Sequence, residues 1–131
     1  MAVQTYPTKA HSYKTATVKG AGLVALAGIM VVHIADLGGK LSEVPYLGYA
    51  YLALILGSVV AAFLILRNNR QGWLLGGALA LGAIIAYTLT RTTGLPNAMD
   101  DIGNWLEPLG VVALLSEAVM VALSGYVLAR R

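Results

Sequence analysis

The chain has 131 residues, of which 58% are hydrophobic and only 11% are charged. Soluble domains usually carry about 25% charged residues, so this chain has too few to cover a surface that faces water. The absence of cysteine excludes disulfides, thiolate metal sites and cysteine nucleophiles. The length limits the chain to a single domain.

A polar segment comes first in the chain and four apolar stretches follow it. The segment covers residues 1–17, and we expect it to lie in the cytoplasm. A helix needs roughly 20 residues to cross the hydrocarbon core, and each apolar stretch is close to that length. The transmembrane domain, residues 18–131, therefore has predicted spans at 18–37, 46–66, 72–90 and 108–128.

Glycine and proline mark the ends of these spans. Gly38 and Gly39 follow the first span, and Pro45 precedes the second. Pro108 suits the first turn of the fourth helix, where a missing N–H group costs nothing. Short connections between successive spans favour an all-α fold in which four helices form an up-down antiparallel bundle.

The basic residues predict the orientation of this bundle. Seven of the nine fall at ends expected to lie together, namely Lys9, Lys14, Lys19, Arg67, Arg70, Arg130 and Arg131. The positive-inside rule places these ends and both termini on the cytoplasmic side of the plasma membrane. Lys40 and Arg91 fall on the opposite side, together with five of the six acidic residues. Because topology explains the charge, we expect no nucleic-acid partner.

Small residues repeat at four-residue spacing in the third span, where they let helices approach closely in lipid. Gly76 and Ala80 belong to one such row and Gly82 belongs to another. We predict that these three residues pack against neighbouring helices, either within the bundle, in a homo-oligomer or in another membrane protein. Glycine and alanine are abundant in this chain, so the same rows can also arise by chance.

Glu117 is the residue that hydrocarbon should exclude most strongly. It lies nine residues after Pro108, about 13 Å along its helix and close to the membrane midplane. An ionised carboxyl group there costs on the order of 3 kcal/mol, so the side chain should face the bundle interior or be protonated. One interpretation is a proton, cation or ligand site. The other is a neutral carboxyl group that hydrogen-bonds a neighbouring helix.

Four further residues join Glu117 in a candidate ligand or proton site. His33 is the only histidine within a predicted span, and Asp36, one turn later, can orient its imidazole. Arg91 ends the third span, and Tyr87 lies one turn before it, placed to form a hydrogen bond within the bundle. A structural clamp is expected between Arg91 and acidic residues of the next loop, Asp100, Asp101 and Glu107.

No metal or cofactor is expected. Zinc, copper and iron sites need three or four ligands, mostly nitrogen or sulfur, whereas this chain has two histidines and no cysteine. His11 and His33 should lie on opposite sides of the membrane, so they cannot together ligate a haem. The sequence contains no phosphate loop, dinucleotide fingerprint or nucleophile elbow, and we expect no enzyme.

Several short runs resemble a group of small four-span membrane proteins of actinobacteria and related prokaryotes. These runs are residues 33–36, 43–48, 90–96, 107–110 and 116–117, so the resemblance covers nearly the whole chain after Val18. The group has no assigned activity. The resemblance therefore implies a prokaryotic four-span fold and joint importance of the outer loops and Glu117, but no site residues.

Two classes of function fit these observations. The first and favoured class is an accessory or structural subunit of a larger membrane protein complex, because no catalytic constellation appears in 131 residues. The second class is a small binding or transport module for a cation, proton, quinone or other small ligand. In that class Glu117, His33 and Arg91 line a pocket that opens outward.

Overall fold

A computed structural model describes residues 9–130, with side chains from Thr15 onward. Its helices are α1 (Lys9–Glu43), α2 (Pro45–Leu66), α3 (Gln71–Arg91) and α4 (Pro108–Ala129). The only β pairing in this part of the chain is an isolated bridge between Leu95 and Ala98. All four helices are long and apolar enough to cross a membrane, which confirms the predicted all-α class and indicates a membrane protein.

Helix α1 is longer than the span predicted from hydropathy. It includes residues 9–17, which we expected to form a separate segment; residues 1–8 lie outside the described part of the chain. It also continues through Gly38 and Gly39 to Glu43, so these glycines do not end the helix as predicted. A glycine inside a helix costs only about 1 kcal/mol relative to alanine, and packing against a neighbouring helix can offset that cost.

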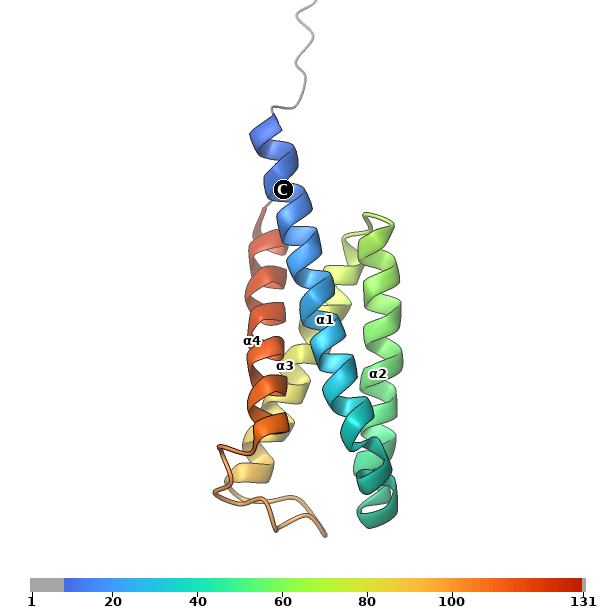
Figure 1. Cartoon of the computed structure of the whole chain (residues 1–131), viewed down its shortest axis with the longest axis vertical. Helices are drawn as coiled ribbons and strands as arrows, with labels where there is room; N and C mark the ends of the chain where they lie inside the picture. The colour runs from blue at the N-terminus through green and yellow to red at the C-terminus, as the bar shows by residue number, and fades with distance from the viewer. Residues whose placement is uncertain (1–8, 131) are drawn as a thin grey trace, which may run out of the picture.

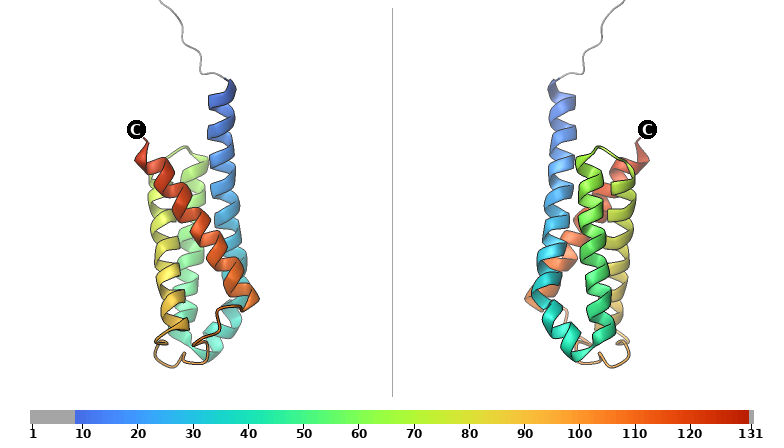
Figure 2. Two further views of the ribbon diagram at one scale, coloured as in Figure 1. Left: turned by 90° about the vertical axis from the view of Figure 1, so that its left-hand side faces the viewer. Right: turned by 90° about the vertical axis from the view of Figure 1, so that its right-hand side faces the viewer.

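Each helix packs against two neighbours: α1 lies between α2 and α4, and α3 lies between the same two helices on the other side (Figure 1). The α2–α3 turn, residues 67–70, defines the turn end of the bundle. The α3–α4 loop, residues 92–107, lies beside the α1–α2 turn and defines the loop end (Figure 2). Helix α4 runs obliquely across the bundle between these two ends.

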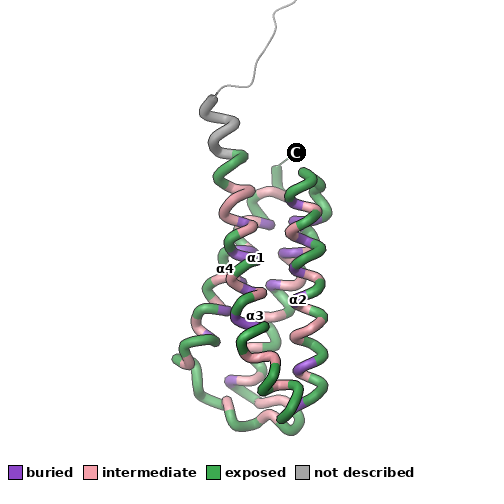
Figure 3. Tube along the Cα trace, turned by 45° about the vertical axis from the view of Figure 1, so that its right-hand side comes forward, coloured by how far each residue is buried: buried purple, intermediate pink, exposed green. Residues whose placement is uncertain are grey.

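The half of the bundle nearer the turn end holds a closely packed core. Leu26, Ile29, Ile65 and Met120 are each at most 1% exposed and belong to one cluster of buried residues. Figure 3 shows the buried positions along the four helices. Trp73 lies at the start of a predicted span, a position typical of tryptophans that lie at the level of the lipid headgroups. The residue is instead only 7% exposed and belongs to this core. The outer faces of the helices carry exposed apolar side chains, as lipid contact requires.

Two of the three predicted packing residues make close helix contacts. A Cβ atom at Gly76 would stand 2.6 Å from Cε of Met120 on α4, and Ala80 is fully buried. Gly82 does not pack as predicted, because nothing lies within 4 Å of the position of its missing Cβ atom. At that level the four helices enclose a cavity.

Gly72 is expected to be essential for the close approach of α3 to α2. A Cβ atom there would meet the backbone, 2.7 Å from Ile65 N and 2.8 Å from Ala61 O. Gly72→Ala should lower the free energy of unfolding by about 1–3 kcal/mol, because backbone cannot move aside as a flexible side chain can. Gly82→Ala, on the same helix, should leave stability unchanged or slightly raised. Unfolding in mixed detergent micelles measures both, and equal effects would contradict this packing.

Candidate ligand cavity

A cavity of about 610 Å³ lies between the four helices near the loop end. All five residues predicted for a ligand or proton site line it, namely His33, Asp36, Tyr87, Arg91 and Glu117. Much of the wall consists of small residues, including Ala50, Ala53, Ala78, Gly82, Ala83, Ala86 and Ala113. Short side chains on facing helices leave the space between their backbones unfilled, so the sequence itself creates this cavity.

His33 and Glu117 meet at the buried end of the cavity. Nε2 of His33 on α1 lies 4.0 Å from Oε2 of Glu117 on α4, and both side chains are buried. Helical rise alone predicts a difference in depth of about 7 Å between them. The observed 4.0 Å distance is shorter than this difference, and Figure 2 shows that α4 runs obliquely across the bundle.

A hydrogen bond of His33 shows which ring nitrogen carries a hydrogen. Nδ1 lies 2.7 Å from the carbonyl oxygen of Ile29, and a carbonyl only accepts, so Nδ1 carries a hydrogen. In the neutral ring Nε2 is then an acceptor that faces the carboxyl group. One further proton, on either Nε2 or Glu117, makes the pair neutral as a whole.

The second carboxyl oxygen of Glu117 has no hydrogen-bond partner among the described residues. Oε1 is fully buried, and the residue as a whole is 1% exposed. A buried polar atom without a partner costs about 1–3 kcal/mol, a cost that a bound polar group would remove. Glu117 is one of the residues that line the cavity.

The sequence suggested that Asp36 orients the imidazole of His33, but no hydrogen bond joins these two side chains in the described structure. Tyr51 on α2 stands between them: its hydroxyl donates to Asp36 Oδ2 at 3.2 Å, and its ring packs edge-on against the imidazole at 4.7 Å. Asp36 also pairs with Lys40 at 3.5 Å. The position of Tyr51 near a helix end is typical of an aromatic belt, so this contact across helices could not be predicted from the sequence.

Arg91 fastens the α3–α4 loop to the end of α3, as predicted. Its guanidinium group lies 3.5 Å from Asp101 and 3.7 Å from Glu107, and its Nε donates to the carbonyl oxygen of Asn104 at 2.8 Å. Asp100, the third acidic candidate, does not pair with Arg91 in the described structure. The Arg91 side chain is only 7% exposed, so this clamp shields it from lipid and water.

Tyr87 joins the same clamp from one turn below. The guanidinium carbon of Arg91 stands 4.3 Å from the centre of its ring, a cation–π contact. Its hydroxyl donates to the carbonyl oxygen of Trp105 at 3.1 Å, so the predicted hydrogen bond runs to the loop. Glu107 in turn accepts from the amide of Gly110 at 2.7 Å and caps α4. The mouth of the cavity is therefore fixed by side chains of α3 and of the α3–α4 loop.

The mouth carries two cations and three carboxylates, and each of them takes part in an ion pair. Lys40 pairs with Asp36, and Arg91 pairs with Asp101 and Glu107, so the mouth has no unpaired cation to attract an anionic ligand. Within residues 15–130, no three histidine or acidic side chains come close enough together to hold a metal ion. The arrangement fits a neutral molecule with one polar group better than an ion.

Comparisons with known proteins add neither a family nor a function to this geometry. No family model, no curated protein and no solved structure matches the chain.

We expect Arg91→Leu to loosen the α3–α4 loop. The substitution removes two ion pairs and a hydrogen bond, but the acidic partners are about one third exposed, so water screens part of the loss. Amide hydrogen exchange of residues 98–107 should become about tenfold faster, which corresponds to about 1.4 kcal/mol. Arg67→Leu at the turn end is the control, because the Arg67 side chain stacks on the ring of Phe63 and lies far from the α3–α4 loop. Equal exchange in both variants would contradict the clamp.

Proposed function

We propose that this chain is a membrane-embedded binding protein for a small neutral molecule, with no catalytic chemistry of its own. One observation carries the proposal: a buried carboxyl oxygen of Glu117 that lacks a partner among the described residues, on the wall of a cavity between four helices. Buried ionisable groups in membrane proteins are enriched at ligand and ion pathways, because their cost in hydrocarbon is otherwise hard to offset.

The lining supports a ligand with one polar head and an apolar body. A His33–Glu117 pair that holds one proton besides the Nδ1 hydrogen can donate to or accept from a carbonyl or hydroxyl group placed beside it. The alanine and leucine walls suit an apolar body, and about 610 Å³ lies within the usual range for small-molecule sites. Quinones and ketones have this chemistry. A bare cation would be repelled by any proton on Nε2 of His33.

The shape of the bundle favours binding over conduction. Leu26, Ile29 and Met120 are fully buried between the cavity and the turn end, so the cavity ends at a packed core in this conformation. A transported ligand would need this core to open. A ligand that enters and leaves from the loop end, or between helices from lipid, needs no such change.

A role as accessory subunit of a larger membrane complex is the second proposal, and it is compatible with ligand binding. The exposed apolar faces of the helices can contact lipid, a second copy or another membrane protein equally well. Purification in mild detergent separates these outcomes. Co-elution with defined larger subunits supports the accessory role, whereas a stable monomer or homo-oligomer supports an independent binding protein.

For topology, we propose an up-down antiparallel bundle in the plasma membrane with both termini in the cytoplasm. The supporting observation is charge: Lys19, Arg67, Arg70 and Arg130 lie at the turn end, where none of the six acidic residues lies. Basic residues accumulate on the cytoplasmic side of membrane proteins.

Single cysteines should report this orientation without interference, because the chain has none of its own. Asn68 and Asn97 have positive φ angles, a backbone conformation that is strained for cysteine. The cysteines are therefore introduced as Gln71→Cys at the turn end and Asp100→Cys at the loop end. A membrane-impermeant maleimide added to intact cells should label Asp100→Cys, and should label Gln71→Cys only after the cells are opened. Labelling of both variants from outside would contradict the topology.

Ligand binding should depend on Glu117. Native mass spectrometry of the protein, extracted from its membrane in mild detergent, should detect one small neutral molecule bound to wild type. Glu117→Leu should lose it, because leucine offers no hydrogen bond at the buried end of the cavity. Glu117→Gln keeps the size of the side chain and its ability to form hydrogen bonds. Loss of the bound molecule in that variant as well would show that binding requires an ionisable group at this position.

Glu43→Gln is the matched control, because Glu43 is exposed and does not line the cavity. It should keep the bound molecule. An identical pattern of bound masses in wild type and Glu117→Leu would contradict the proposed function.

A further inference from the structure

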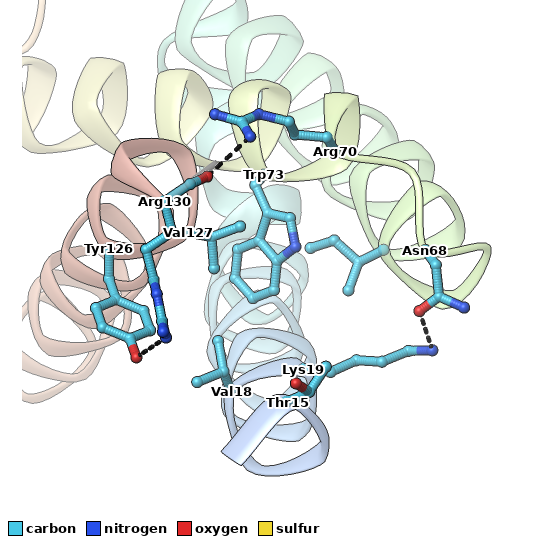
Figure 4. A pocket seen from close by; sticks show the side chains of 10 residues that line it. Thr15, Val18, Lys19, Asn68, Arg70, Trp73, Tyr126, Val127 and Arg130 are labelled. Atoms are coloured by element: carbon cyan, nitrogen blue, oxygen red, sulfur yellow. Dashed lines mark hydrogen bonds between the residues drawn. The ribbon is translucent and has the colours of Figure 1, made fainter. Parts of the chain in front are cut away.

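A second cavity, of about 320 Å³, lies at the turn end of the bundle, on the opposite side of the core from the first (Figure 4). Residues of all four helices and of the α2–α3 turn line it. Its rim carries three cationic side chains, Lys19, Arg70 and Arg130. Trp73 stands at its centre in Figure 4, with Val18 and Val127 on either side.

Hydrogen bonds to neutral oxygen atoms hold the three cations in place. Lys19 donates to the carbonyl oxygen of Leu66 at 3.2 Å and to the side chain of Asn68 at 3.0 Å. Arg70 donates to the carbonyl oxygen of Arg130 at 3.0 Å and also to that of Leu128. These carbonyl groups end α2 and α4 and would otherwise lack helical partners. The cationic groups are therefore fixed before any ligand arrives.

No carboxylate neutralises these cations within the described residues. The ion pairs found there involve His33, Lys40 and Arg91, all on the loop side of the core. Arg130 donates instead to the hydroxyl of Tyr126 and stacks 5.0 Å from its ring. Three positive charges thus surround one cavity with no counter-charge among residues 15–130, so an anion should be attracted from outside.

The wall below the cations is apolar. Trp73 is 7% exposed, and Val18, Ile65 and Val127 complete this part of the lining. A free phosphate ion would use the charged rim alone and leave this wall uncovered. An anion joined to a hydrocarbon chain would use both parts.

We propose that this cavity binds one anionic phospholipid. Its phosphate group lies among Arg130, Arg70 and Lys19, and the first part of one acyl chain covers Trp73 and Val127. The position at the ends of the membrane-spanning helices is the level at which lipid headgroups lie. This inference does not depend on the proposed function of the first cavity, which lies beyond the packed core.

Trp73 provides the test, because the chain has only two tryptophans. In a Trp105→Phe background, Trp73 is the only tryptophan and its fluorescence reports contact with bromine atoms, which quench it. The protein is placed in phosphatidylcholine nanodiscs that contain increasing fractions of either phosphatidylglycerol or phosphatidylcholine with acyl chains brominated near the glycerol end. Quenching by brominated phosphatidylglycerol should saturate at a low fraction, whereas quenching by brominated phosphatidylcholine should follow its bulk fraction.

Single substitutions at the rim should weaken this preference. Arg130→Gln and Lys19→Gln should each raise the half-saturating fraction of phosphatidylglycerol about fivefold, the effect of one cation near a membrane surface. Arg67→Gln is the matched control, because Arg67 is also at the turn end but does not line the cavity. It should leave the half-saturating fraction unchanged.

Three results would overturn the proposal. Equal quenching by the two lipids would show that Trp73 has no preference for an anionic lipid. Equal effects of Arg130→Gln and Arg67→Gln would show only general attraction to the surface. Displacement of quenching by millimolar inorganic phosphate, with matched sodium chloride inactive, would assign the cavity to a soluble anion instead.

Discussion

The carboxyl group of Glu117 needs a polar neighbour within the hydrocarbon core, because an ionised side chain near the membrane midplane costs on the order of 3 kcal/mol. His33 on α1 is that neighbour, at 4.0 Å, and its own Nδ1–H group donates to the carbonyl oxygen of Ile29. The pair lies at the boundary between the packed core and the first cavity. One carboxyl oxygen remains for a ligand to satisfy.

Residue size divides the bundle into two halves with different properties. Toward the turn end, Gly72 and Gly76 let backbones approach, and large side chains such as Trp73 and Met120 fill the remaining space. Toward the loop end, alanine and glycine make up much of the facing walls, so a cavity of about 610 Å³ remains. Because no hydrophobic effect drives helices together in lipid, this packing must supply the stability. The open half can therefore serve binding while the closed half holds the bundle together.

Hydropathy and proline predicted most of the fold, whereas contacts between helices could not be derived from them. The limits of α2, α3 and α4 agree with the predicted spans within one residue at each end, since Pro45 and Pro108 mark two helix starts. Of the site, Glu117 and His33 stood out because hydrocarbon excludes polar groups. Tyr51 did not, because its link between His33 and Asp36 exists only once α1 and α2 pack.

The central claim is that His33 on α1 and Glu117 on α4 stabilise the bundle as an interacting pair. A double-mutant cycle with His33→Leu and Glu117→Leu, followed by unfolding in mixed micelles, measures that interaction directly. We predict a coupling energy of about 0.6–1.7 kcal/mol, the range found for hydrogen-bonded pairs between membrane helices. Effects of the two substitutions that add within about 0.3 kcal/mol would contradict the pairing.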